Sequence, residues 1–166
     1  MNYCKSEFIV WANTFSCGVK PIDDQHKELI SLVNEMFNHV TGDEKQEREY
    51  FNKVFLKVVN YIRVHFATEE KIMLVTRFSG YNEHKMAHDN FISTVKNYIY
   101  NFTSGKRFSL YTFTKFLKNW VLSHIAIMDK QYFEYFRKTA IRNRASGNLN
   151  ISSAGIRPVE KLNLAQ

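Results

Sequence analysis

The stretch VHFATEEKIM, residues Val64 to Met73, places a histidine and a glutamate where a helix would be expected to present apolar side chains. Steps of three and four residues put a long series of positions on one helical face. That series reads Phe51, Val54, Val58, Ile62, His65, Glu69 and Met73. A glutamate buried without a partner would cost several kcal/mol or take up a proton. Either this face is exposed, or a group inside the protein binds the two polar side chains.

The composition predicts one helical globular domain. The chain has 166 residues, 45% of them hydrophobic and 23% charged, which is enough for one substantial core. Only two prolines and six glycines interrupt it, so long helices are expected rather than many short strands. No run of eighteen apolar residues is present, and we therefore expect no membrane span.

Helical periodicity predicts an all-α fold, an up-down-up-down antiparallel four-helix bundle with short connections. The first helix is expected to begin near Asp23, which could act as its N-cap. The four predicted helices span about residues 23–40, 43–75, 82–102 and 109–140.

The two ends of the chain are predicted to be an arm and a tail. Residues 1–20 carry apolar side chains that should pack on the bundle, so the predicted domain is 1–140 with this arm included. Residues 141–166 form a basic C-terminal tail, irregular from Ser146 onward. Six basic residues and one acidic residue follow position 136, so most of the formal charge of +7 belongs to this end. This distribution argues against a nucleic-acid-binding domain and leaves an anionic partner for the tail as an open prediction.

The two cysteines, Cys4 and Cys17, are too few for a disulfide framework, and the first residues lack the long apolar segment of a signal peptide. A cytoplasmic location is therefore expected.

Five of the six histidines fall on the apolar stripes of the four predicted helices, together with two acids. These seven residues are His26, His65, Glu69, His84, His88, His124 and Asp129. The sixth, His39, lies on another face of its helix and should be solvated. A single core histidine is usually just hydrogen-bonded, but two buried carboxylates among five imidazoles lack compensating charge. A first-row transition metal would supply that charge.

The number of donor atoms favours two metal ions over one. Five imidazoles and two carboxylates offer nine donor atoms, too many for a single ion. If both carboxylates bridge and an oxo or hydroxo group is shared, a metal with three histidines has six ligands and the other has five. One metal would then keep an open position, and the cluster would be nearly neutral with two divalent ions.

These motifs resemble the hemerythrin family in its bacterial single-domain form, over about residues 9–135. The matching stretches are Trp11, GVKPIDDQHKELI around His26, HFATEEKIM at 65–73, HKMAHDNFI at 84–92 and WVLSHIAIMD at 120–129. The resemblance implies a non-haem centre of two iron ions with an oxo or hydroxo bridge. It implies that the six-coordinate iron is held by His84, His88 and His124. It also implies that His26 and His65 hold the iron with the open position, and that Glu69 and Asp129 bridge the two ions.

The resemblance further implies reversible O₂ binding for storage, delivery or scavenging, and no enzymatic activity. The O₂ pocket should be apolar and dry, and its predicted lining is Leu29, Phe66, Trp120 and Val121. Two alternatives stay open. A di-iron oxidase would need Glu-x-x-His units, which the sequence lacks, and a module that senses O₂ or redox state would use the same site. The family often has a Tyr-Pro pair before the third helix, where this chain reads RFSGYNEH, so the shape of that connection is not predicted.

The spacing of His124 and Asp129 predicts an irregular fourth helix. Five residues at 100° each place the two side chains about 140° apart on a regular helix, too far for one compact cluster. A π-bulge, in which residues i and i+5 share a face, or a bend near residues 126–128, would bring them together. The alternative is a tilted but regular helix.

Overall fold

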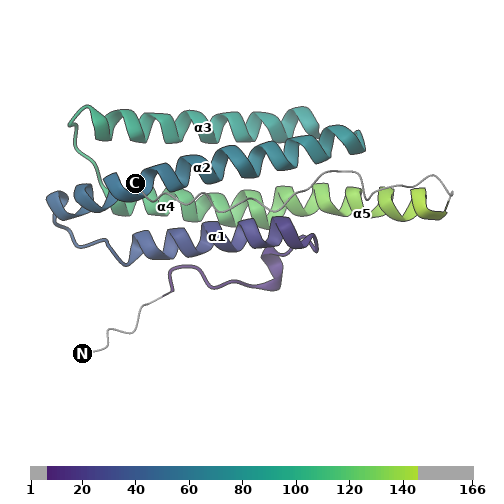
Figure 1. The fold of residues 1–166 in the computed structure, drawn as a ribbon, viewed down its shortest axis with the longest axis horizontal. Helices are drawn as coiled ribbons and strands as arrows, with labels where there is room; N and C mark the ends of the chain where they lie inside the picture. Colours follow the sequence, from purple (N-terminus) through teal and green to yellow (C-terminus); the bar gives the residue numbers. More distant parts are fainter. Residues whose placement is uncertain (1–6, 146–166) are drawn as a thin grey trace, which may run out of the picture.

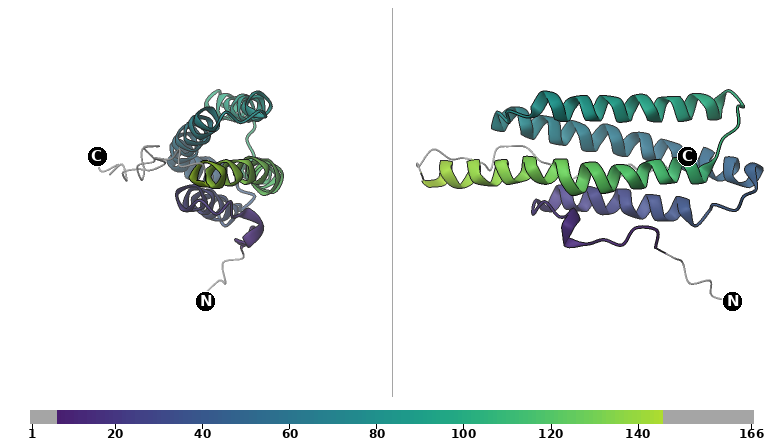
Figure 2. Two further views of the ribbon diagram at one scale, coloured as in Figure 1. Left: turned by 90° about the vertical axis from the view of Figure 1, so that its right-hand side faces the viewer. Right: turned by 180° about the vertical axis from the view of Figure 1, so that it is seen from behind.

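The structure, a computed structural model that describes residues 7–145, is a four-helix bundle (Figure 1). Successive helices run antiparallel, so the predicted all-α, up-down-up-down architecture is confirmed (Figure 2). The fourth helix is continuous but has three parts, α4, the π-helical segment η2, and α5. The elements are η1 (Asn13–Phe15), α1 (Lys20–Phe37), α2 (Glu44–Thr76), α3 (Tyr81–Thr103), α4 (Leu110–Trp120), η2 (Val121–Asp129) and α5 (Lys130–Ala145).

Two of the helix starts follow from side-chain caps. The Asp43 carboxylate accepts hydrogen bonds from the backbone N–H groups of Lys45 and Gln46 at the start of α2. The Ser109 hydroxyl accepts one from Thr112 at the start of α4. Both caps satisfy N–H groups that have no partner inside the helix. The starts predicted for these two helices are therefore confirmed.

The predicted start of α1 at Asp23 is wrong. The helix begins three residues earlier, at Lys20, with Pro21 in its first turn, where a proline costs no hydrogen bond. The Asp23 carboxylate instead accepts hydrogen bonds from the Ser16 hydroxyl, at 2.7 Å, and from the Cys17 backbone N–H, at 2.8 Å. This carboxylate thus fixes the chain that leads into the helix.

The N-terminal arm packs against α1 and α4, as predicted for the part of it that the structure describes. Asn34 on α1 makes two hydrogen bonds of 2.8 Å with the backbone of Ile9, one to its N–H and one to its carbonyl. Lys118 on α4 donates to the Phe8 carbonyl at 2.9 Å. The ring of Phe8 stacks on Phe37.

The connection between α2 and α3 is tight. Arg77 ends α2 in the left-handed region, at φ 53° and ψ 46°, which is uncommon for a residue other than glycine. The hydroxyl of Tyr135 on α5 lies 3.3 Å from the Thr76 carbonyl and 3.2 Å from that of Arg77. A hydrogen bond from the fourth helix therefore holds the end of the second, close to the start of α3.

Two apolar clusters fill the bundle, one on each side of a layer of buried polar residues. Along α1, Ile22 belongs to the smaller cluster and Leu29 to the larger, with His26 between them. Along α2, the larger cluster ends at Phe66 and the smaller begins at Ile72. The apolar clusters therefore exclude water from both ends of the polar layer.

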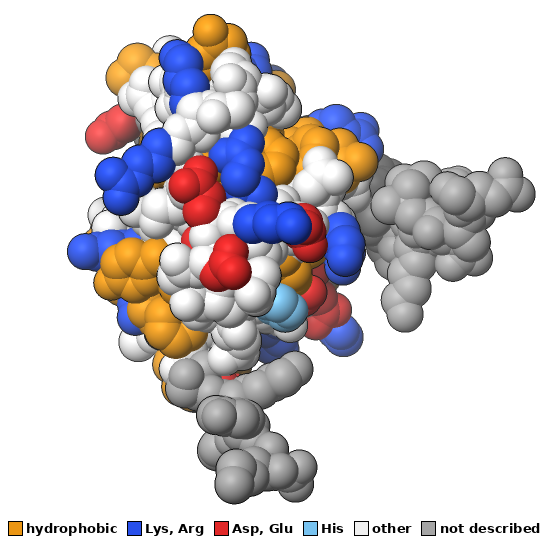
Figure 3. Space-filling view, turned by 90° about the vertical axis from the view of Figure 1, so that its left-hand side faces the viewer, with side chains coloured by type: hydrophobic (Ala, Val, Ile, Leu, Met, Phe, Trp, Pro, Cys, Tyr) orange, Lys and Arg blue, Asp and Glu red, His pale blue; other side chains and the backbone are white. Residues whose placement is uncertain are grey.

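Two further predictions concern residues outside this core. His39 is exposed, as predicted. The last helix continues to Ala145, five residues past its expected end, whereas the rest of the predicted tail lies outside the described residues. Positive and negative side chains are interspersed on the end of the bundle that carries the α1–α2 and α3–α4 connections (Figure 3). None of the helices within residues 7–145 is long and apolar enough to cross a membrane.

We predict that Phe51→Ala destabilises the protein by about 3–5 kcal/mol, because the ring is fully buried among the aromatic rings of Phe102, Phe108 and Phe113 and its removal leaves a cavity. Urea unfolding followed by circular dichroism measures the change. The control is Leu56→Ala on the same helix, where the side chain is 57% exposed and the change should stay within about 0.5 kcal/mol. Equal effects at both positions would contradict this assignment of the core.

Candidate metal centre

The seven side chains predicted from the sequence meet in the polar layer between the two apolar clusters. None is more than 3% exposed. All four helices contribute, so no single element contains the site. The contributions are His26 from α1; His65 and Glu69 from α2; His84 and His88 from α3; and His124 and Asp129 from η2.

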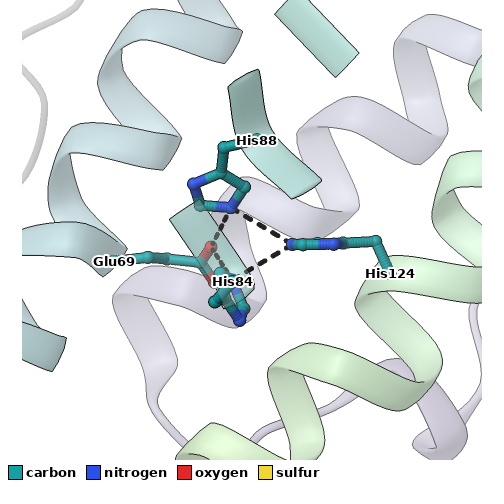
Figure 4. Close-up of side chains that lie close together, drawn as sticks. All are labelled: Glu69, His84, His88 and His124. Atoms are coloured by element: carbon teal, nitrogen blue, oxygen red, sulfur yellow. Dashed lines mark hydrogen bonds and ion pairs between the residues drawn. The ribbon is translucent and has the colours of Figure 1, made fainter. Parts of the chain in front are cut away.

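Three imidazole nitrogens converge in the first of two groups (Figure 4). The Nε2 atom of His124 lies 3.1 Å from the Nε2 atoms of both His84 and His88. Glu69 completes the group, with Oε2 at 3.3 Å from His88 Nε2 and 3.5 Å from His84 Nε2. A neutral imidazole has one protonated nitrogen, so three converging nitrogens cannot all satisfy one another, whereas one cation could accept all three lone pairs.

The second group contains two imidazoles and both carboxylates. One ligand atom from each of His26, His65, Glu69 and Asp129 lies within 4.8 Å of the others. His26 Nε2 is 3.3 Å from Asp129 Oδ2, and His65 Nε2 is 3.7 Å from Glu69 Oε1. Both imidazoles therefore direct Nε2 toward the carboxylates.

Each carboxylate presents one oxygen to each group. Glu69 directs Oε1 toward His65 and Oε2 toward His84 and His88. Asp129 directs Oδ2 toward His26, and its Oδ1 lies 3.1 Å from His124 Nε2 and 3.3 Å from His84 Nε2. This is the arrangement that a pair of bridging carboxylates requires.

The buried polar atoms of the site fit two cations. All four carboxylate oxygens, together with Nε2 of His26 and of His65, are buried without a hydrogen-bond partner of good geometry. Two ligand atoms at right angles, each about 2.1 Å from one ion, lie about 3 Å apart, close to the nitrogen–oxygen contacts seen here. Imidazole with carboxylate is a donor set that first-row transition metals favour.

The far side of three imidazoles is held by acceptors that the sequence interpretation missed. Nδ1 of His26 lies 3.2 Å from the Phe15 carbonyl, Nδ1 of His65 lies 2.9 Å from Gln25 Oε1, and Nδ1 of His88 lies 3.0 Å from Glu70 Oε1. A proton on each Nδ1 would leave the Nε2 lone pair free for a metal. Two of these acceptors adjoin a predicted ligand in the sequence, since Gln25 precedes His26 and Glu70 follows Glu69. Each, however, supports an imidazole on another helix or further along the chain.

The electrostatics of the site differ between its imidazoles. Burial opposes the charged form of His26, but the Asp129 carboxylate raises its pKa. Burial, and then the charge of His26, hold the pKa of His65 well below its usual value, so this imidazole keeps its lone pair. Burial and the negative charge of Asp129 raise the pKa of Glu69. A bound cation would stabilise the ionised form of this carboxylate, which the metal-free site disfavours.

Of the four residues predicted to line a pocket, Phe66 and Trp120 pack directly against imidazoles. Leu29, Phe66 and Val121 are buried, and Trp120 is half-buried. The ring of Phe66 stacks on His88 at 3.7 Å between centroids, and Trp120 stacks on His124 at 3.9 Å. These rings shield the three-histidine group from water on one side.

The irregular fourth helix is confirmed. Val121 to Asp129 forms a π-helix, and the backbone remains helical on either side of it. The wider turn brings residues five apart onto one face, which places Asp129 beside His124. The alternative of a regular, tilted helix is wrong.

Comparison with known proteins agrees with this geometry. Residues 17–136 match the family model described as the hemerythrin HHE cation binding domain. The chain belongs to the hemerythrin family. A bacteriohemerythrin of Stenotrophomonas maltophilia is 32% identical over 124 residues, covering 75% of this chain and 78% of that protein. A myohemerythrin of Sipunculus nudus is 27% identical over 124 residues, covering 74% of this chain and 89% of that protein.

Solved structures of hemerythrin share the fold. The crystal structure of wild-type hemerythrin superposes with a TM-score of 0.67 at 24% identity, covering 78% of this chain and 98% of the other. The matched hemerythrin segment, residues 17–136, includes all seven residues of the two groups. The α2–α3 connection without the Tyr-Pro pair is thus accommodated within the family's fold.

We predict that removal of metal destabilises the protein. Chelation would leave two buried carboxylates and five imidazoles without their cations, and metal that binds only the folded chain stabilises it by mass action. The melting temperature should fall by about 10 °C or more and return when Fe²⁺ is added anaerobically. Differential scanning calorimetry with and without chelator measures this. An unchanged melting temperature after verified iron loss would contradict the site.

Proposed function

We propose that this protein binds O₂ reversibly at a non-haem di-iron centre held by the seven residues of the two groups, for oxygen storage, delivery or scavenging. One observation carries the proposal: three imidazoles lie in one group and two in the other, and both groups share the two carboxylates. The three-histidine group would complete six ligands with both carboxylates and an oxo or hydroxo bridge. The two-histidine group would have five, which leaves an open position for a small ligand. The hemerythrin relatives support iron as the metal.

The protein's own residues would keep this chemistry reversible. Two iron ions, when bound, would supply the coordination position and the electrons that O₂ needs. Leu29, Phe66 and Val121 carry no polar side-chain atom and are buried beside the site, so they would exclude the water and proton donors that promote irreversible oxidation. The acceptors on Nδ1 of His26, His65 and His88 would hold the imidazoles in place.

A carrier is favoured over an oxidase by the donor set. Carboxylate-rich sites with Glu-x-x-His units are typical of di-iron oxidases, whereas five imidazoles and two carboxylates form this site. A sensor of O₂ or redox state would use the same residues. A carrier would release O₂ from a stable oxygenated form, whereas a sensor would convert rapidly to an oxidised form. The cytoplasmic location stays a prediction.

We predict an absorption band that depends on O₂. Protein reduced anaerobically should be nearly colourless, gain a visible charge-transfer band on exposure to air, and lose it when O₂ is removed under argon. Repeated cycles measured by optical spectroscopy test reversibility. Rapid conversion to a permanently oxidised form, with no recovery on removing O₂, would contradict a carrier and favour a sensor or an oxidase.

We predict that Glu69→Ala abolishes the di-iron centre. One oxygen of this carboxylate faces each histidine group, so its loss would leave both cations with less compensating charge. Iron measured by mass spectrometry should fall from two per chain to near zero. Glu70→Ala removes the partner of His88 Nδ1 and an ion pair with Lys85, and it should weaken iron binding by about 10–100-fold without abolishing the site.

The control for Glu69→Ala is Glu49→Ala, an exposed glutamate on the same helix that should leave two irons per chain. Two irons retained in Glu69→Ala would show that this carboxylate does not bridge.

A further inference from the structure

The hydroxyl of Tyr61 is buried beside the candidate metal centre without a hydrogen-bond partner. Tyr61 is 6% exposed, and its oxygen has no donor or acceptor within reach. Buried tyrosine hydroxyls usually find a partner, because an unmade hydrogen bond costs stability. Because no described residue pairs with the Tyr61 hydroxyl, a bound ligand is the candidate partner for its hydrogen bond.

Tyr61 lies on the side of the site where the pocket is expected. It sits one turn before His65 on α2, and it belongs to the same apolar cluster as Leu29, Phe66 and Val121. The other phenol near the site is Tyr132, whose buried oxygen also has no partner. It belongs instead to the smaller cluster on the opposite side.

Its ring contact places Tyr61 beside the two-histidine group. The ring stacks on His65, with centroids 5.1 Å apart and planes 25° apart. A second unpaired donor, Trp120 Nε1, is also buried on the larger cluster's side, but the Trp120 ring stacks on His124 of the three-histidine group. Of the two donors, Tyr61 is therefore the one beside the two-histidine group, where the open position is proposed.

We propose that the Tyr61 hydroxyl donates a hydrogen bond to a small ligand, O₂ or a small anion, held at the open position of the two-histidine group. This inference rests on the proposed function. A phenol keeps its proton at neutral pH, so it donates a hydrogen bond without releasing the proton. The predicted lining residues Leu29, Phe66 and Val121 belong to the same apolar cluster and offer no hydrogen bond, so one such donor would favour ligands that carry negative charge when bound.

The test compares Tyr61→Phe with Tyr132→Phe, each of which removes one buried oxygen. Azide is titrated into the oxidised, iron-loaded proteins and followed by absorbance, iron is counted, and the metal-free chains are unfolded in urea. Tyr61→Phe should keep two irons, be at least as stable as the parent without metal, and bind azide about tenfold more weakly. Tyr132→Phe should leave the azide dissociation constant unchanged.

A second measurement uses the parent protein alone. The antisymmetric stretch of bound azide should shift between H₂O and D₂O, because the donated proton exchanges. An absent shift would overturn the proposal. An unchanged azide affinity in iron-loaded Tyr61→Phe, an equal loss in Tyr132→Phe, or loss of iron from Tyr61→Phe alone would also overturn it. A parent protein that binds no iron would instead refute the proposed function itself.

Discussion

The structure depends on two carboxylates, Glu69 and Asp129, that are fully buried among five imidazoles. Negative charge in a low-dielectric interior is tolerable only with compensating positive charge. Nearby imidazoles compensate in part, but four carboxylate oxygens remain without hydrogen-bond donors. Two cations would resolve the imbalance, and the four helices are arranged so that each contributes to holding them. The apolar clusters on both sides then serve the site as well as the fold, because they exclude the water that would otherwise solvate these charges.

Helix geometry limits how ligands reach such a centre. His65 with Glu69, and His84 with His88, use the four-residue spacing that a regular helix brings onto one face. The fourth helix uses a spacing of five, and its π-helical segment accommodates it. The adjustment is local, since α5 continues beyond Asp129 and buries Tyr132 and Phe133 in the smaller cluster. A departure from regular secondary structure therefore occurs where the site requires it.

The N-terminal arm is part of the site as well as of the fold. Its Phe15 carbonyl accepts from Nδ1 of His26, and Asp23 holds the chain just after it through Ser16 and Cys17. The arm is fixed further along by Asn34, which bonds to the backbone of Ile9. The orientation of one imidazole is thus set by a segment outside the four helices. Rigid support of this kind is what keeps a metal-binding side chain in a productive position.

The sequence by itself determined the four helices and the seven candidate ligands, because both follow from local periodicity: polar residues on an apolar stripe stand out within two or three turns. Even the π-helical segment was predictable from the spacing of His124 and Asp129. Only the tertiary structure decided which carboxylate oxygen faces which histidine group, and that Gln25 on α1 supports His65 on α2. It also decided that Asp23 binds the arm instead of capping α1. These contacts join segments distant in the chain, so they depend on how the helices pack, and no pattern within one helix contains that information.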